Sequence, residues 1–238
     1  GDPTRVTIFG QSAGAISCAV LLTNPTVIKE NLVHRAIIQS NTFSLRFRTM
    51  SEQQAATELF YALLGCRIND TSCLYSKSMK EILDIQLYNI HLDLPIDIIS
   101  LLGVLPWAPV VNGKVIFCGS LMYQLFLTNQ IIQDLLDQPV RLFNYGKFHQ
   151  VPILLGATTN ETMCFISDAM KALNLTDINE LMYYGLLQLI FGDNAPIVWS
   201  RYPPVTGGAA AMANASTDLI FLCSTRYAAE GLTYVTHF

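Results

Sequence analysis

The sequence predicts an α/β fold, in which a mainly parallel β-sheet is covered by helices. Strand-like and helix-like runs alternate along the chain, and the strand-like runs are apolar on both faces, as in parallel sheets covered by helices. The 238 residues are 51% hydrophobic and 13% charged, which is enough apolar material for one sizeable core. No repeat or linker-like stretch divides the chain, so we expect residues 1–238 to form one incomplete domain.

The first predicted elements form a strand, a turn and a helix. The run RVTIF at 5–9 predicts a short buried strand. The small-residue run SAGAISCAVLL at 12–22 follows at once and predicts a closely packed helix.

The remaining elements continue the alternation. HRAIIQS at 34–40 predicts a second strand, and the pattern at 51–66 predicts a helix that is capped by Ser51 and ends at Gly65. VPILLGAT at 151–158 predicts a third strand and INELMYYGLLQLIFG at 178–192 an amphipathic helix. LTYVTHF at 232–238 predicts the start of a fourth strand.

Charge and hydropathy exclude several classes of partner. The net charge is −4, and the 14 Lys and Arg residues are not clustered, so we expect no nucleic-acid partner. The most apolar region, 96–111, is broken by Pro106 and Pro109 and is too short for a membrane-spanning helix. The six cysteines form no C-x-x-C pair and the four histidines are scattered, so the sequence indicates no metal site and no cofactor.

The motif GQSAG at 10–14 places a serine hydroxyl between two glycines. A serine is a weak nucleophile, and a tight strand-to-helix turn with small neighbours holds its hydroxyl clear of the backbone beside a base. Gly10 and Gly14 would supply that room, and the Ala13 N–H would donate to the oxyanion of a tetrahedral intermediate. The strand before the motif and the helix after it predict that Ser12 is a nucleophile rather than a chance match.

Six segments of the chain carry a family resemblance. They are GDPTRVTIFGQSAGA (1–15), LVHRAIIQSN (32–41), LLGC with a second cysteine (63–73), WAPVVNG (107–113), VPILLGATTNET (151–162) and DLIFLCSTRYA (218–228). In the same order, they resemble segments of the type-B carboxylesterases, an α/β-hydrolase family that includes the cholinesterases. The resemblance covers essentially the whole chain, from the nucleophile block to just before the catalytic histidine. It implies an incomplete α/β-hydrolase fold that lacks the N-terminal strands and the C-terminal histidine segment.

The resemblance implies that Glu161 is the acid of a catalytic triad. From composition alone, a glutamate in a loop is more often a solvated surface charge. Glu161 instead follows a predicted buried strand, in the position of the family's acid, where it would orient a histidine and stabilise its imidazolium form. The family's preceding aspartate is Asn160 here, and its following glycine is Thr162.

None of the four histidines has the setting expected of the catalytic base. His34 matches a position that is structural in the family, and His91 and His149 lie in loop-like, partly polar segments where a solvated imidazole is expected. His237 comes last in the order Ser, Glu, His, but YVTHF resembles the strand before the histidine loop, and no H-G dipeptide follows. We therefore expect the base, and the glycine loop that supplies further oxyanion donors, to lie outside this chain.

Two further residues match family positions near the active site. Gln11 stands where cholinesterases and many carboxylesterases have a glutamate, so a neutral ester is a better substrate candidate than a cationic choline ester. A simple structural hydrogen bond is the alternative role for Gln11. Ser40 matches a serine near the site and would support the catalytic residues, with an ordinary strand-end hydroxyl as the alternative.

Cys66 and Cys73 match the family's loop disulfide, with two buried free thiols as the alternative. Glycosylation sequons occur at four asparagines, of which those in polar loops at 69 and 174 are the better sites. A disulfide together with glycans would favour a secreted protein or one of the secretory pathway. The four sequons begin at Asn69, Asn160, Asn174 and Asn214.

The resemblance implies a carboxylic-ester hydrolase that works by acyl transfer on small-molecule esters. A non-catalytic adhesion or interaction domain on the same fold is one alternative, although such relatives often lose the nucleophile. A truncated remnant that does not function alone is the other.

Overall fold

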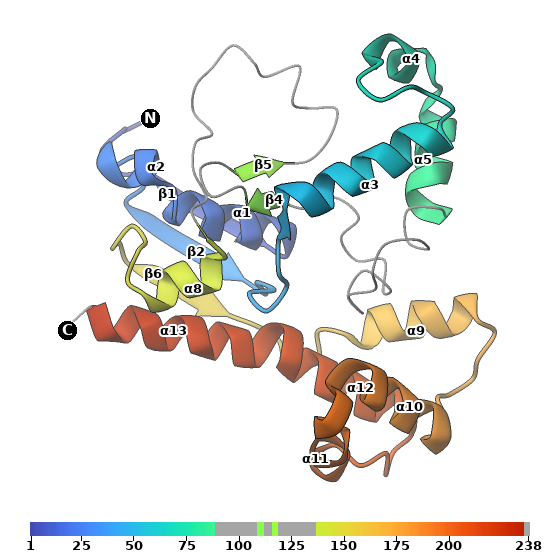
Figure 1. Ribbon diagram of the computed structural model, residues 1–238. Helices are drawn as coiled ribbons and strands as arrows, with labels where there is room; N and C mark the ends of the chain where they lie inside the picture. Colours follow the sequence, from blue (N-terminus) through green and yellow to red (C-terminus); the bar gives the residue numbers. More distant parts are fainter. Residues whose placement is uncertain (89–108, 112–115, 119–136, 236–238) are drawn as a thin grey trace. The chain divides into compact units, whose positions relative to one another are not determined.

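The computed structural model describes residues 1–88, 109–111, 116–118 and 137–235 (Figure 1). The chain divides into two compact units, one made of residues 1–45 and 139–238 and the other of residues 46–138. His91, His237, Trp107 and most of the apolar region 96–111 lie outside the described residues.

The first unit is built on a parallel three-stranded sheet. Its order is β1 (Thr7–Gln11), β2 (Arg35–Gln39) and β6 (Ile153–Gly156), so the strand between β1 and β6 is β2. In the register, Phe9 lies opposite Ile37, which lies opposite Leu154. The three strands expected at 5–9, 34–40 and 151–158 are therefore present and parallel.

One face of this sheet carries the core of the first unit. Ile8, Ile38 and Leu155 lie on this face and pack in one cluster with side chains of the flanking helices. The nucleophile helix α1 (Ala13–Leu22) contributes Ala15, Cys18, Ala19 and Leu22 to the same cluster, so its small residues allow it to lie close on the sheet. The other helices around this core are α2 (Pro25–Lys29), α8 (Pro139–Asn144) and α13 (Cys223–Val235).

The opposite face of the sheet differs from the expectation that the strands are buried on both faces. Phe9 is 76% exposed and Leu154 is 64% exposed, because the helices α1, α8 and α13 pack on the other face. Among the described residues, the sheet is therefore covered on one face.

A second core of the first unit lies among four helices and centres on the fully buried Tyr183 and Leu187. The helix expected at 178–192 is α10, which begins after Asn179; the Asn179 side chain accepts a hydrogen bond from the Met182 N–H at 2.9 Å. The helices are α9 (Met163–Ala172), α10 (Glu180–Phe191), α11 (Ala195–Arg201) and α12 (Gly208–Thr217), with a short 3-10 segment at Gly192–Asn194.

The prediction of a strand from residue 232 is wrong, because residues 223–235 form the helix α13 after a π-helical segment, Asp218–Leu222. Ala228 and Leu232, one helical turn apart, pack on the core of the first unit. A Cβ on Gly231 would lie 2.7 Å from the Phe143 carbonyl oxygen. The missing side chain lets α13 lie directly against α8 (Figure 1), and this packing overrides the local strand preference of the β-branched and aromatic residues that follow.

The described part of the second unit contains a small mixed sheet and three helices. The strand β4 (Pro109–Val111) pairs parallel with β3 (Arg48–Thr49) and antiparallel with β5 (Ile116–Cys118). The helices are α3 (Met50–Leu63), α4 (Thr71–Ser76) and α5 (Met79–Tyr88).

The N-terminus of α3 corrects the predicted cap. Thr49, not Ser51, is the N-cap, and its side chain forms a reciprocal capping box with Glu52. Arg46 also donates two hydrogen bonds to the Glu52 carboxylate, at 2.7 and 3.0 Å. The helix therefore begins directly after Thr49, where the Glu52 carboxylate accepts hydrogen bonds from both the N-cap residue and Arg46. Gly65, with φ 67°, follows the end of the helix as predicted.

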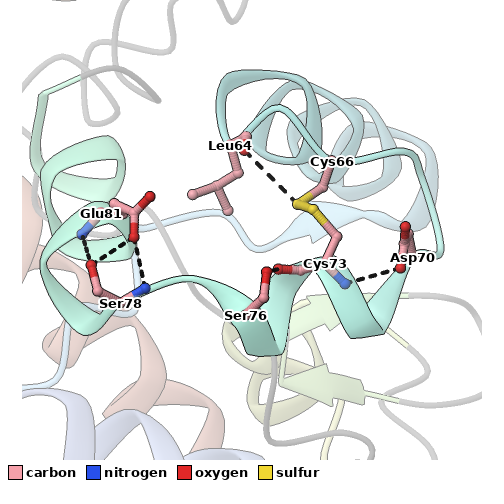
Figure 2. The surroundings of a disulfide bond; sticks show 7 residues. All are labelled: Leu64, Cys66, Asp70, Cys73, Ser76, Ser78 and Glu81. Atoms are coloured by element: carbon pink, nitrogen blue, oxygen red, sulfur yellow. Dashed lines mark hydrogen bonds between the residues drawn. A yellow bond between two sulfur atoms is a disulfide. The ribbon is translucent and has the colours of Figure 1, made fainter.

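Cys66 and Cys73 form a disulfide with a Cα–Cα distance of 5.7 Å (Figure 2). Asp70 caps the short helix α4 by accepting a hydrogen bond from the Cys73 N–H at 3.0 Å. The disulfide therefore ties the end of α3 to the first turn of α4, and the pairing implied by the family resemblance is present.

In the described ranges, which stop at residue 88 and resume fully at 137, none of the helices has both the length and the hydropathy needed to cross a membrane.

The capping box predicts a pH dependence of stability. The hydrogen bonds from Arg46 lower the pKa of Glu52 from 4.5 to about 2. A carboxyl group with a lowered pKa in the folded state stabilises that state at pH values above its unfolded pKa, and the contribution is lost as the pH falls toward about 2. We expect Glu52→Gln to lower the free energy of unfolding at pH 7 by about 0.5–1 kcal/mol. The difference from wild type should shrink as the pH falls from about 4.5 to about 2 in denaturant unfolding.

The control for this prediction is Glu58→Gln, which changes an exposed carboxylate on the same helix. If the difference in unfolding free energy between Glu52→Gln and wild type is the same at every pH, the prediction is contradicted.

The disulfide should stabilise the second unit by restricting its unfolded chain. We expect the double variant Cys66→Ser, Cys73→Ser to lose about 2 kcal/mol of unfolding free energy, measured by denaturant titration, because the bond closes a short loop. Cys164→Ser removes an exposed free thiol and should leave the stability unchanged. Equal unfolding curves for the double variant and the wild-type protein would contradict this expectation.

Candidate active site

Ser12 lies in the turn between β1 and α1, with φ 54° and ψ −119°. A non-glycine residue rarely adopts this conformation, and strain of this kind is concentrated at functional sites. The Ser12 N–H donates to the Gln39 carbonyl at 3.0 Å, and the Ser12 carbonyl accepts from the Ile16 N–H at 3.0 Å. The backbone of Ser12 is thus held by the neighbouring strand on one side and by its own helix on the other.

The two glycines of the motif have different roles. A Cβ on Gly10 would lie 2.3 Å from the carbonyl carbon and oxygen of Gly14, a contact with rigid backbone that no side chain tolerates. A Cβ on Gly14 would meet nothing within 4 Å. The expectation that both glycines supply room is therefore correct for Gly10 only.

The hydroxyl of Ser12 is not used to cap its own helix. Ser12 occupies the N-cap position, where a serine side chain ordinarily accepts an N–H from the first turn, but it makes no such bond. The N–H of Ala13, the first residue of α1, belongs to the helix N-terminal groups that have no partner within the helix. Ala13 is exposed, so this N–H lies beside Ser12 at an accessible helix end.

Ser40 and Glu161 lie at the same edge of the sheet as Ser12. Ser40 follows β2, also with a positive φ of 54°, and its N–H donates to the Gly156 carbonyl at 2.7 Å. Glu161 belongs to the turn after β6, here called the acid turn (residues 157–162). Because the three strands are parallel, their carboxyl ends bring Ser12, Ser40 and the acid turn to one edge.

The carboxylate of Glu161 is held through one of its two oxygens. Ser40 Oγ donates to Oε1 at 2.7 Å, and the Thr158 N–H donates to the same oxygen at 2.6 Å. Both hydrogen bonds from described residues end on Oε1. The carboxylate is therefore fixed in direction while Oε2 keeps its capacity to accept a hydrogen bond.

The acid turn is also bound through its backbone to a residue that the sequence did not single out. The N–H groups of Glu161 and Thr162 lie 3.2 and 3.3 Å from the hydroxyl oxygen of Thr217, at the end of α12. Thr162 has φ −103°, which any residue adopts, so the turn does not require the glycine that the family has there. The only sequence signal for Thr217 was its place directly before Asp218 in a family-like segment.

The two described histidines lie away from this edge. His149 is buried, in contrast to the expected solvated imidazole. Its ring Nε2 lies 2.8 Å from the Val33 carbonyl oxygen, and its backbone N–H donates to the Leu22 carbonyl at 2.6 Å. His34 Nδ1 accepts a hydrogen bond from the Val6 N–H at 3.2 Å. Both histidines precede strands, at the amino edge of the sheet, so neither is placed to deprotonate Ser12.

The other residues considered from sequence have simple settings. Gln11 is exposed at the end of β1, opposite Gln39, on the face away from α1. Cys18 is buried in the core, and burial raises the pKa of its thiol. The part of the chain that the structure describes contains no cluster of three metal-binding side chains.

Comparison with known proteins identifies the family. The model of the carboxylesterase family matches residues 1–189. The chain belongs to the carboxylesterase family. Solved structures agree: the carboxylesterase of Geobacillus stearothermophilus matches 98% of this chain and 42% of its own with a TM-score of 0.65 at 24% identity. A PNB esterase matches 98% of this chain and 43% of its own with a TM-score of 0.62 at 21% identity. The predicted α/β-hydrolase fold is thereby confirmed.

Curated relatives of this carboxylesterase-family chain have diverse names. Crystal protein from Dictyostelium discoideum is 28% identical over 95% of the chain and 37% of its own length. Human neuroligin-3 is 31% identical over 70% of the chain and 16% of its own length. Pig liver carboxylesterase is 38% identical over 37% of the chain and 16% of its own length. The chain thus spans less than half the length of these relatives.

The geometry of the nucleophile turn predicts opposite effects for its two glycines. Gly10→Ala should lower the free energy of unfolding by about 3 kcal/mol, because the new methyl group overlaps the backbone of Gly14. Gly14→Ala adds the same methyl group in open space within a helix and should leave the protein as stable or slightly more stable. Denaturant unfolding of the two variants measures the difference, and equal losses would contradict the structure of the turn.

Proposed function

We propose that this chain carries the nucleophile and the acid of a carboxylic-ester hydrolase. The observation that carries the proposal is that two features lie at the same sheet edge. Ser12 has a strained backbone and a hydroxyl that does not cap its helix, and the carboxylate of Glu161 is oriented by hydrogen bonds. A strained serine turn and a carboxylate held by Ser40 and Thr158 serve acyl transfer, and neither is needed for a sheet edge that only packs.

Each residue has a defined part in the proposed reaction. Ser12 Oγ attacks the ester carbonyl and gives its proton to a histidine supplied by a longer protein that contains this chain. Glu161 accepts the other N–H of that histidine at Oε2, and its charge stabilises the imidazolium. The Ala13 N–H donates to the oxyanion, the ester C–O bond breaks, and the alcohol leaves with the proton that the histidine took from Ser12. Water, deprotonated by the same histidine, then attacks the acyl group, and the carboxylic acid leaves as Ser12 regains its proton. The uncharged Gln11 favours a neutral ester over a cationic one.

The alternative functions are a non-catalytic interaction domain and a remnant without function. The similarity to neuroligin-3 is the reason why the experiment below also tests for a non-catalytic interaction domain. The presence of Ser12, Ser40 and Glu161 at one sheet edge supports the enzyme, because an interaction surface requires neither an uncapped serine nor a carboxylate oriented by Ser40.

A secreted protein, or one of the secretory pathway, fits the same proposal. The disulfide between Cys66 and Cys73 persists in an oxidising compartment. The asparagines of all four sequons are exposed, and Asn69 and Asn174 lie in turns with positive φ, where a glycan would point into solvent.

The test is hydrolysis of a p-nitrophenyl ester by the full-length protein and by the 238-residue chain alone. The full-length protein should turn over, and the short chain should release product at the background rate, because neither of the two described histidines is placed to deprotonate Ser12. Ser12→Ala should lower kcat/KM by at least about 10³-fold and Glu161→Gln by on the order of 10³-fold.

The matched control is Ser17→Ala, which removes an exposed serine hydroxyl one turn further along α1 and should leave the rate unchanged. An inactive full-length protein would favour the interaction domain. Rapid hydrolysis by the short chain would mean that a histidine within it is the base.

A further inference from the structure

Thr217 is a buried hydroxyl at the centre of the contacts that hold the acid turn. It is 1% exposed and is the last residue of α12. Its Oγ1 accepts hydrogen bonds from the N–H groups of Glu161 and Thr162 and lies 3.1 Å from Thr162 Oγ1. The Thr217 side chain thus holds the backbone of Glu161 and of the next residue, and this backbone sets the position of the Glu161 Cα.

The proton count determines the direction of these hydrogen bonds. A threonine hydroxyl has one hydrogen and two acceptor positions. Thr162 Oγ1 lies 2.8 Å from the Ala213 carbonyl, 2.7 Å from Ser216 Oγ and 3.1 Å from Thr217 Oγ1. Its one hydrogen is donated to the Ala213 carbonyl, so it acts as an acceptor toward Thr217. Thr217 then donates to Thr162 and accepts from the two backbone N–H groups, which uses its full capacity.

The helix that carries Thr217 is held at its other end by close packing. A Cβ on Gly208 would lie 2.1 Å from the Ile178 carbonyl oxygen, and the Ala209 N–H donates to Asp177 Oδ1 at 3.1 Å. Directly after Thr217, Asp218 accepts a hydrogen bond from the Tyr202 hydroxyl at 2.5 Å. The position of Thr217 is therefore set by contacts on both sides of it in the chain.

We propose that Thr217 is a positioning residue of the ester hydrolase, which fixes the backbone of the acid turn so that Glu161 Oε2 faces the base. The inference rests on the proposed function. Ser40 and Thr158 hold the carboxylate at Oε1, and Thr217 holds the main chain from which that carboxylate projects. Thr162, which stands in place of the family's glycine, shares the hydroxyl of Thr217 and thereby joins the turn to α12.

The contact itself is tested by hydrogen exchange in the full-length protein. Thr217→Val keeps the shape of the side chain but leaves the Glu161 and Thr162 N–H groups without an acceptor. These two amides should exchange about tenfold faster than in wild type. Thr217→Ser restores the hydroxyl and should restore slow exchange.

The catalytic consequence is tested by kinetics on the same variants. In Thr217→Val, kcat for a p-nitrophenyl ester should fall about tenfold with little change in KM, because Glu161 is less well oriented while substrate contacts are unchanged. The acid limb of the kcat/KM profile should move to lower pH, since a poorly placed carboxylate stabilises the imidazolium less. Thr217→Ser should return both values to those of wild type.

Thr23→Val is the matched control, because Thr23 is also buried at a helix end but donates only to the Ala19 and Val20 carbonyls. It should change neither the pH profile nor the exchange at the acid turn. If the wild-type protein is active and Thr217→Val has the same kcat and amide exchange, this inference alone is overturned. The same holds if Thr217→Ser is as impaired as Thr217→Val. An inactive wild-type protein would overturn the proposed function and the inference with it.

Discussion

The close approach of the Gly10 and Gly14 backbones is the constraint on which the rest of the site depends. Because Gly10 has no Cβ, the backbone of Gly14 can lie against it, and the helix α1 begins directly after β1 with Ser12 at a positive φ between them. That conformation holds the serine hydroxyl outside the hydrogen bonds of its own helix. A Cβ at Gly10 would overlap the Gly14 backbone, so α1 could not lie this close to β1.

The parallel sheet brings residues that are distant in the sequence to the same edge as Ser12. The hydrogen bonds from Ser12 to Gln39 and from Ser40 to Gly156 continue the pairing one residue past the strand ends. Ser40 and Glu161, 121 positions apart in sequence, therefore meet at 2.7 Å. A parallel register, once set, places all three strand ends at a common edge.

Several differences between expectation and structure have one cause, which is packing between distant segments. Residues 233–235 are of types that favour strands but continue α13, because the bare backbone of Gly231 packs on Phe143 and Asn144. His149 looks like a solvated loop residue but is buried where it meets Val33. In each case, burial against a segment far away in the chain outweighed the local preference.

Short-range steric rules allowed the sequence alone to determine the strand–turn–helix around Ser12 and the Gly65 helix end. The alternation of apolar strands and helices indicated the parallel sheet, and the loop that Cys66 and Cys73 close was implied by the family resemblance. The tertiary structure alone decided which donors hold Glu161, that Gly14 is not sterically required, and that Thr217 binds the acid turn. The physical reason is the range of the interactions. Turns, caps and amphipathic faces depend on neighbours within a few residues, whereas hydrogen bonds across a sheet edge depend on strand order and helix packing, which no local pattern encodes.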